Sequence, residues 1–68
     1  MTDTVKVIFV SGDGSETKEV NWQVEDYATS VATGKHAEYV REATPMVEQE
    51  IGRGARVIST LVNDVEQP

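Results

Sequence analysis

Hydrophobic and polar residues alternate through the first third of the chain in the pattern typical of β-strands. The two segments with this pattern are TVKVIFV, residues 4–10, and TKEVNWQV, residues 17–24. Both are rich in β-branched and aromatic residues, which favour strands. SGDGSE lies between them, and its Asp13-Gly14 pair is a strong signal for a tight turn. These residues are therefore predicted to form an antiparallel β-hairpin.

The register of this hairpin is limited by the faces that its apolar side chains share. Pairing Val7 with Trp22 places the apolar residues of both strands on one face and leaves a four-residue loop. Sliding the strands by two residues, to a two-residue Asp-Gly loop, keeps the same faces together. A slip of one residue would set apolar side chains against polar ones. Trp22 is accordingly expected to be a core residue.

Helical spacing replaces this alternation after residue 24. Residues 25–34, EDYATSVATG, are read as a short helix closed by Gly34 in a left-handed conformation, with a polar connection as the alternative. KHAEYVREA, residues 35–43, is a stronger helix candidate. Thr44-Pro45 has the form of a helix start, with Thr as the N-cap and Pro at the first helical position. The alternative is that Pro45 kinks one long helix.

The C-terminal third has the most regular helical periodicity. Its apolar residues recur at spacings of three and four, which predicts a long amphipathic helix, and the pattern extends backwards as a heptad seam. A strand over residues 55–65 is the alternative, because the segment is rich in β-branched residues. Its period-two faces, however, mix Val57 with Ser59 and Ile58 with Thr60, which favours the helix.

The predicted fold is α+β, in a single small domain over residues 1–68. An N-terminal antiparallel β-hairpin, at about 4–24, is followed by a helical region at about 25–66 that holds one or two helices, the C-terminal one long and amphipathic.

Gly54 interrupts the apolar seam of the predicted C-terminal helix. A missing side chain there makes a notch that a neighbouring backbone or a large side chain can approach closely. The neighbour is either internal, with Trp22 or Phe9 filling the notch, or a second chain. A helix of about 20 residues spans about 30 Å, longer than a short hairpin covers, so self-association is predicted. The residues predicted to form this oligomer interface are Val47, Ile51, Gly54, Ile58, Leu61, Val62 and Val65.

The charge balance is strongly acidic. Twelve Asp and Glu residues face six Lys and Arg residues, which gives a formal net charge of −6. The basic residues are scattered, so direct binding of nucleic acid is not expected. The acidic excess favours solubility or attraction to a basic protein surface. The carboxylates predicted to bind such a partner are Glu38, Glu42, Glu48, Glu50, Asp64 and Glu66.

The chain lacks the residue patterns of common catalytic and metal sites. It has no cysteine and one histidine, His36, which is expected to pack on an apolar helical face. Gly34-Lys35 lacks the remainder of a phosphate-binding loop, and GRGARV lacks the third glycine of a dinucleotide fingerprint. The acidic residues do not have the spacing of a ligand loop. We expect no enzymatic activity, no cofactor and no bound metal.

No targeting segment or membrane span is predicted. The N-terminus carries Asp3 where a signal peptide has positive charge, and the apolar run that follows is short. Nothing approaches the roughly 20 apolar residues of a transmembrane helix. A cytoplasmic protein without membrane contact is therefore expected.

The segment VKVIFVSGDGSETKEV resembles the opening hairpin of β-grasp [2Fe–2S] ferredoxins, in which a similar strand, Asp-Gly turn and strand begin the fold. The resemblance covers less than a third of the chain, and the cluster cysteines are absent. It implies a hairpin and no redox function.

The function predicted from these features is a non-enzymatic protein–protein interaction module that forms homo-oligomers through its C-terminal helix. In its more specific form, the module is an acidic phage-type inhibitor or accessory protein that occupies a basic surface of a nucleic-acid-binding protein, by analogy with other small acidic proteins. The alternative is a small structural subunit or assembly factor. Such a subunit would dock through apolar contacts centred on Ile51, Ile58, Leu61 and Val65.

Overall fold

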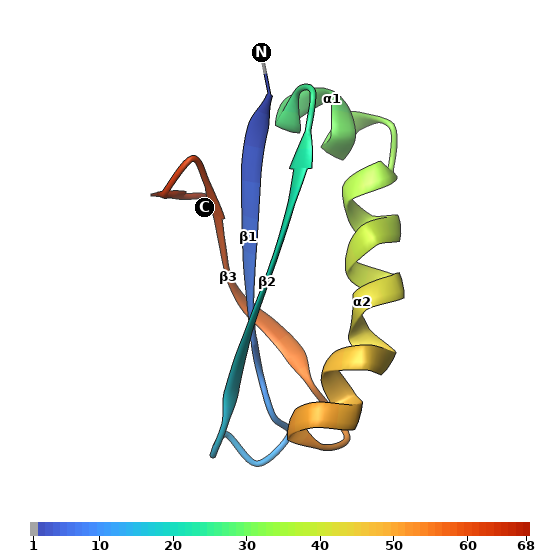
Figure 1. Ribbon diagram of the computed structural model, residues 1–68, viewed down its shortest axis with the longest axis vertical. Helices are drawn as coiled ribbons and strands as arrows, with labels where there is room; N and C mark the ends of the chain where they lie inside the picture. Colours follow the sequence, from blue (N-terminus) through green and yellow to red (C-terminus); the bar gives the residue numbers. More distant parts are fainter. Residues whose placement is uncertain (1) are drawn as a thin grey trace.

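Two helices lie on the same side of a four-stranded antiparallel sheet in the structure, a computed structural model that describes residues 2–68 (Figure 1). The sheet has the strand order β2-β1-β3-β4, so the first strand is central and pairs with strands from both ends of the chain. The α+β class and the N-terminal hairpin are confirmed. The elements are β1 (Asp3–Val10), β2 (Thr17–Val24), α1 (Tyr27–Ala32), α2 (Lys35–Ile51), β3 (Arg56–Val62) and β4 (Val65–Glu66).

The hairpin has the second of the two registers that keep its apolar faces together. Val7 pairs with Val20 rather than with Trp22. The ladder ends at the pair of Val10 and Thr17, so the connection is longer than a two-residue loop.

Asp13 organises this longer connection. Its Oδ1 accepts hydrogen bonds from Ser11 Oγ at 2.7 Å and from both the backbone N and the Oγ of Ser15 at 2.9 and 2.7 Å. These bonds stabilise the carboxylate and lower the pKa of Asp13 to about 2. Local side-chain hydrogen bonds therefore stabilise a wider turn than the Asp-Gly pair alone predicts.

The core lies between the central strand and α2. Alternate residues of β1, namely Val5, Val7 and Phe9, are at most 1% exposed. They pack against Ala43 and Val47 of α2, which are 8% and 0% exposed. The period-two pattern of β1 and the helical spacing of α2 thus meet in one small cluster.

The predicted short helix is confirmed as α1. Asp26 is its N-cap and accepts a hydrogen bond from Thr29 N at 3.1 Å. Gly34 follows the helix in the left-handed conformation, with φ 81°, as predicted. The same residue precedes the first turn of α2.

Pro45 lies inside one continuous helix, so it does not start a new one. Thr44 Oγ1 donates to Val40 O at 2.8 Å and therefore acts within the helix rather than as an N-cap. Pro45 has no backbone N–H, so the carbonyl of Arg41, one turn earlier, lacks its usual helical donor. Residues 2–68 contain no helix that is both long and apolar enough to cross a membrane.

The predicted long C-terminal helix is wrong. α2 ends at Ile51, and residues 56–62 form a strand that pairs antiparallel with the free side of β1. Gly52 and Gly54, with φ of 101° and 78°, turn the chain back towards the sheet. The strand alternative was the correct one, because the β-branched segment completes the sheet beside the central strand.

A β-bulge explains why the alternation of this strand does not follow a regular period of two. Ile8 pairs with Ser59, and the next residue of β1, Phe9, pairs with Val57, so Ile58 is an extra residue in β3. One extra residue reverses the phase of the alternation. The mixed period-two faces that favoured a helix are therefore the signature of the bulge.

Candidate functional site

The seven residues predicted to form a helical interface lie on three elements and one loop, because the helix that would have aligned them does not exist. Val47 is completely buried against the sheet, so it is not available to a partner. Ile51 packs beside the same core at the end of α2. The remaining five are Gly54 in the α2–β3 loop, Ile58, Leu61 and Val62 in β3, and Val65 in β4.

The close approach predicted at Gly54 exists and is internal. A Cβ atom on Gly54 would lie 3.3 Å from the Cα of Gly12, in the connection between β1 and β2. A Cβ atom on Gly12 would lie 2.7 Å from the backbone oxygen of Arg53. The notch is therefore filled by the backbone of this hairpin connection rather than by an aromatic side chain or a second chain.

A row of exposed β-branched side chains lies on β3 and β4. α2 packs on β1 and β2, and Figure 1 shows β4 and the adjoining part of β3 on the side away from it. Val57 pairs with the buried Phe9, and Val62 pairs with the buried Val5 on one side and with Val65 on the other. The three valines therefore lie on the face of the sheet that the helix covers elsewhere. Val57, Ile58 and Val65 are 38%, 53% and 63% exposed. We call Val57, Ile58, Val62 and Val65 the β3–β4 surface.

The two edges of the sheet differ in their chemistry. β4 protects one end of β3, where Gln67 N also donates to Thr60 O at 2.8 Å. Within residues 2–68, the stretch 56–59 of β3 has no strand on its outer side. The edge strand β2 at the other side exposes no large hydrophobic side chain and carries Lys18 and Glu19 instead. Charged residues of this kind protect edges, so the β3–β4 edge is the less protected one.

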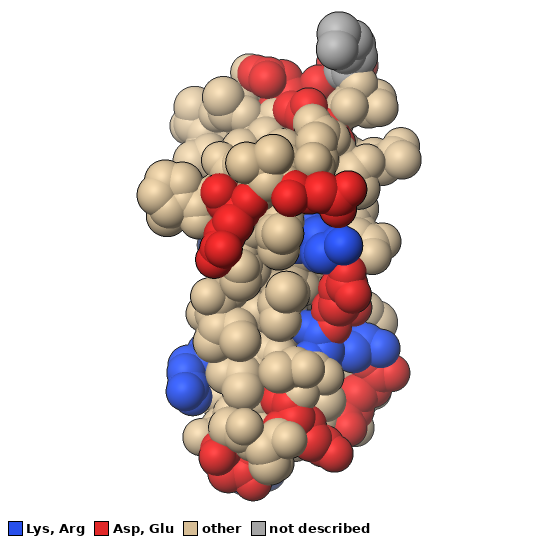
Figure 2. All heavy atoms as spheres, turned by 90° about the vertical axis from the view of Figure 1, so that its left-hand side faces the viewer, with Lys and Arg blue, Asp and Glu red and all other residues tan. Residues whose placement is uncertain are grey.

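Charges of both signs flank the β3–β4 surface. Arg56 stands at the start of β3 and is exposed. Glu66, in β4, accepts a hydrogen bond from Ser59 Oγ at 3.2 Å. Asp64, in the turn between the strands, lies 3.6 Å from Lys6 Nζ. Figure 2 shows this side of the molecule, with basic side chains next to acidic ones in its middle and further acidic ones at both ends.

The six carboxylates predicted to bind a partner do not form one surface. Four lie on α2 and two in the β3–β4 hairpin. Most of them bind donors of their own chain: Glu48 accepts from Gly54 N at 2.8 Å, and Glu50 pairs with Lys18 Nζ at 2.9 Å. Asp64 and Glu66 are engaged as described above. Of the six, only Glu38 and Glu42 lack a side-chain hydrogen bond or ion pair within residues 2–68.

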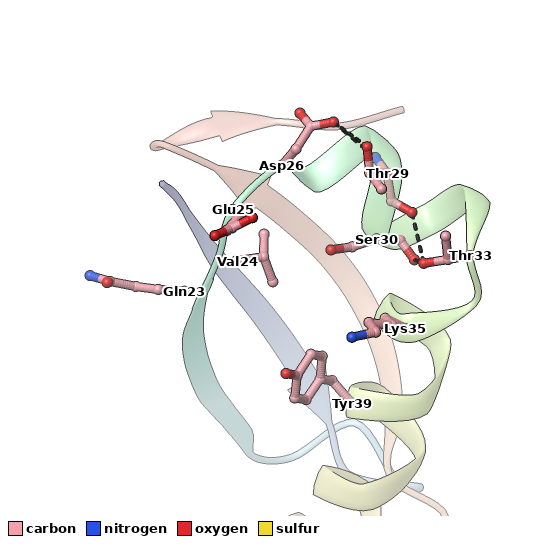
Figure 3. Close-up of a pocket in the computed structure, with 9 residues that line it drawn as sticks. All are labelled: Gln23, Val24, Glu25, Asp26, Thr29, Ser30, Thr33, Lys35 and Tyr39. Carbon is pink, nitrogen blue, oxygen red and sulfur yellow. Dashed lines mark hydrogen bonds between the residues drawn. The ribbon is translucent and has the colours of Figure 1, made fainter. Parts of the chain in front are cut away.

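A hollow of about 480 Å³ lies between the end of β2, α1 and the first turn of α2 (Figure 3). Lys35 and Tyr39 point into it from α2, whereas Gln23 points away from the helices (Figure 3). Its remaining lining residues are Val24, Glu25, Asp26, Thr29, Ser30 and Thr33. A smaller hollow of about 240 Å³ adjoins it, bounded by Lys35, Glu38, Tyr39 and Glu42.

The large hollow offers hydrogen-bonding groups but no recognisable acid–base pair. Asp26 Oδ2 already accepts a 2.6 Å hydrogen bond from Thr29 Oγ1, and Thr33 Oγ1 donates to Thr29 O at 2.9 Å. His36, the one imidazole, does not line it. The described residues also contain no group of three side chains placed to hold a metal ion. The hollow therefore offers hydrogen-bonding groups of both charge signs to a polar group.

Four rings join β2 to the two helices. Trp22 lies 5.8 Å from His36 and 5.5 Å from Tyr39, and Tyr27 meets His36 edge-on at 5.2 Å between ring centroids. His36 Nδ1 and Trp22 Nε1 are buried without a hydrogen-bond partner among the described residues. Burial lowers the pKa of His36. The predicted packing role of His36 agrees with this arrangement, but no spacing in the sequence indicated the four-ring cluster.

Comparison with known protein families, with characterised proteins and with solved structures finds no match to this chain.

Proposed function

We propose that this chain is a non-enzymatic protein–protein interaction module that associates with a second copy of itself through the β3–β4 surface. The observation that carries the proposal is the exposed row of Val57, Ile58 and Val65 on the less protected edge of the sheet. Exposed apolar residues beside an open strand edge are typical of surfaces that another chain covers.

The size of this surface supports weak association. Full burial of an exposed Val or Ile side chain contributes about 1.5–3 kcal/mol, and these three side chains are about half exposed. Covering them in both copies contributes on the order of 5 kcal/mol, near the lower limit of the about 4–15 kcal/mol that association costs. Hydrogen bonds at the open edge and charge pairs add to the apolar term. A weak dimer, with a dissociation constant on the order of a millimolar, is expected.

Sedimentation equilibrium over a range of protein concentrations tests this proposal. The wild-type mass should rise from one to two chains as concentration increases. Val65→Lys should keep the protein monomeric, because it places a charge on the surface to be covered. Val31→Lys is the matched control, since Val31 is 50% exposed on α1, away from β3 and β4. A wild type that stays monomeric throughout, or equal effects of the two variants, would refute the proposal.

The smaller hollow, bounded by Lys35, Glu38, Tyr39 and Glu42, supports a second candidate function, the binding of a basic protein partner. Glu38 and Glu42 form no ion pair within residues 2–68 and lie beside Lys35 and Tyr39, where an Arg or Lys side chain can reach both carboxylates and the ring. Removing both charges with Glu38→Gln and Glu42→Gln should weaken the salt-sensitive binding of a lysine-rich peptide. Glu50→Gln, which removes a charge already paired with Lys18, is the control. Equal binding by all variants would eliminate this candidate.

A further inference from the structure

We propose that protonation of His36 releases residues 27–42 from the sheet, which makes the first half of the helical layer an acid-sensitive conformational device. This stretch, called here helical segment 27–42, comprises α1, the link at Gly34 and the first half of α2. The second half of α2 stays packed on β1 in both states. The device does not depend on the proposed self-association, because the β3–β4 surface lies on other elements.

Helical segment 27–42 is held by less apolar packing than the rest of the helical layer. None of its apolar side chains is buried, and Tyr27 and Val40 are half-buried against the core. The buried apolar residues of the helices, Ala43 and Val47, follow it in α2 and pack against β1. Segments with few buried apolar contacts open at a smaller free-energy cost than the core. The segment can therefore open while β1 and the second half of α2 remain folded.

His36 joins this segment to the sheet and the two helices to each other. Its ring lies 5.8 Å from that of Trp22 in β2 and 5.2 Å from that of Tyr27 in α1, measured between ring centroids. Tyr39, one turn further along α2, lies 5.5 Å from the same tryptophan. Removal of the His36 ring from this cluster therefore weakens the contacts of α1, α2 and β2 together.

A proton on His36 creates a buried donor without an acceptor. His36 Nδ1 is buried and has no hydrogen-bond partner within residues 2–68. A neutral imidazole carries one N–H, whereas the imidazolium carries an N–H on both nitrogens, and a buried N–H without an acceptor costs the desolvation of that group. Trp22 Nε1 is likewise buried without a partner, and release gives both nitrogens access to water. Burial accordingly lowers the pKa of His36 in the closed state.

The elements packed against His36 provide no counter-charge. No carboxylate within residues 2–68 forms an ion pair with it. The face of β2 that it meets is apolar except for Lys18, which is bound to a carboxylate of α2. From α1 it meets Tyr27, and Asp3 already accepts the backbone N–H of that residue at 2.9 Å. Asp26, the N-cap of α1, accepts the helix's own N–H groups.

The position of His36 within α2 further disfavours a positive charge. It is the second residue of the helix, where the unpaired backbone N–H groups carry a partial positive charge. Lys35 precedes it, and Gly34 at the N-cap has no side chain to bind those groups. Glu38, the acidic residue of the first turn, is exposed and offsets only part of this effect. Protonation therefore destabilises the start of α2 as well as the ring cluster.

The pH response has a defined direction. In the released state His36 has its ordinary pKa of 6.5, and in the closed state its pKa is lower. Above 6.5 the ring is neutral in both states, so the closed state is favoured. As the pH falls below 6.5, the released state binds the proton first and its population rises, levelling off below the closed-state pKa. The total rise equals the ratio of the two acid dissociation constants.

Amide hydrogen exchange of the full chain, followed by NMR from pH 7 to pH 5 and corrected for intrinsic exchange rates, tests the device. The amides of Ser30, Thr33 and Glu38, which donate hydrogen bonds within helical segment 27–42, should lose protection as the pH falls. The amides of Val7 in β1 and Val47 in α2 should keep theirs. Acrylamide quenching of the single tryptophan should increase over the same pH range.

Three variants assign the response to His36. His36→Gln and His36→Phe do not titrate, the second keeps an aromatic ring, and both should have equal segment protection at pH 7 and pH 5. Lys35→Gln removes the neighbouring fixed charge and should keep the pH dependence.

Three outcomes would overturn the proposal. An equal loss of protection in the wild type and in both His36 variants would assign the response to other groups. A matching loss at Val7 and Val47 would mean that the whole chain unfolds. Constant or increased protection of the segment in the wild type would mean that the rings accommodate the imidazolium in the closed state. This last comparison uses the wild type alone, so it holds even if a variant fails to fold.

Discussion

Replacing Gly54 with alanine should destabilise the fold more than the same replacement at Gly14. Both glycines have left-handed backbone conformations, with φ of 78° and 79°. They differ in their surroundings, because a Cβ atom on Gly14 would meet nothing within 4 Å, whereas one on Gly54 would lie 3.3 Å from the Cα of Gly12. Gly14→Ala therefore measures the backbone strain alone, and Gly54→Ala measures the strain together with the contact between two loops.

The expected magnitudes follow from these two terms. An alanine in the left-handed region costs about 1–2 kcal/mol, which is the expected effect of Gly14→Ala. Gly54→Ala should add up to about 1 kcal/mol, because two backbone segments must move apart by a few tenths of an ångström. Gly12 is not in the left-handed region, so Gly12→Ala isolates the steric term. Its Cβ would lie 2.7 Å from Arg53 O, an overlap that costs about 1–3 kcal/mol, offset by about 0.4–1 kcal/mol from the less flexible unfolded chain.

Urea unfolding, followed by the fluorescence of the one tryptophan and by circular dichroism, measures these differences. A chain of 68 residues has a total stability of roughly 3–10 kcal/mol, so the effects are a large share of it. Each 1 kcal/mol should also lower the melting temperature by about 4–8 °C. The double variant of Gly12 and Gly54 should lose less than the sum of the single losses, because both changes separate the same two loops. Equal losses for Gly14→Ala and Gly54→Ala, together with a neutral Gly12→Ala, would show that the loops are not in contact.

Two further substitutions test α2. Burial lowers the pKa of His36 below its ordinary 6.5, so the folded state binds this proton less readily than the unfolded state, and stability should fall as pH decreases through the unfolded pKa. The stability difference between the wild type and His36→Gln, measured from pH 7 to pH 5, should therefore shift against the wild type, and a constant difference would contradict the reasoning. Pro45→Ala should raise the free energy of unfolding by about 1–3 kcal/mol, because it restores the N–H donor to the carbonyl of Arg41 in the helix interior. Thermal unfolding checks this, and a lower melting temperature would mean that Pro45 has a stabilising role in the native helix.

The N-terminal half of the fold could be predicted because its determinants are local. The alternation in β1 and β2, the Asp13-Gly14 turn and the left-handed Gly34 each depend on residues only a few positions apart in the chain. The C-terminal third could not be predicted in this way, because its apolar spacing fits a helix and a bulged strand equally well. The extra residue, Ile58, changes the phase of the alternation, and only pairing with β1 reveals which residue is extra.

Prediction of the β3–β4 surface also required knowledge of how β3 pairs with β1. Ile58 and Val65 were predicted interface residues and are exposed, whereas Val47 was predicted with them and is fully buried. In a strand, consecutive side chains point to opposite faces of the sheet, so Leu61 and Val62 cannot belong to the same surface. The β-branched content of RVISTLV was the signal that could have identified the strand, and with it the exposed edge.

By itself the sequence determined the α+β class, the hairpin, the start of a helical segment after residue 24 and the acidic excess, because periodicity, turn chemistry and charge are properties of neighbouring residues. The tertiary structure decided which side of β1 would receive a third strand, which carboxylates bind donors of their own chain, and which apolar side chains remain uncovered. Those outcomes depend on contacts between residues that are distant in the chain, such as Val5 with Val62 and Gly12 with Gly54. Local patterns carry no information about such contacts, since the free energy that selects them appears only when the segments meet.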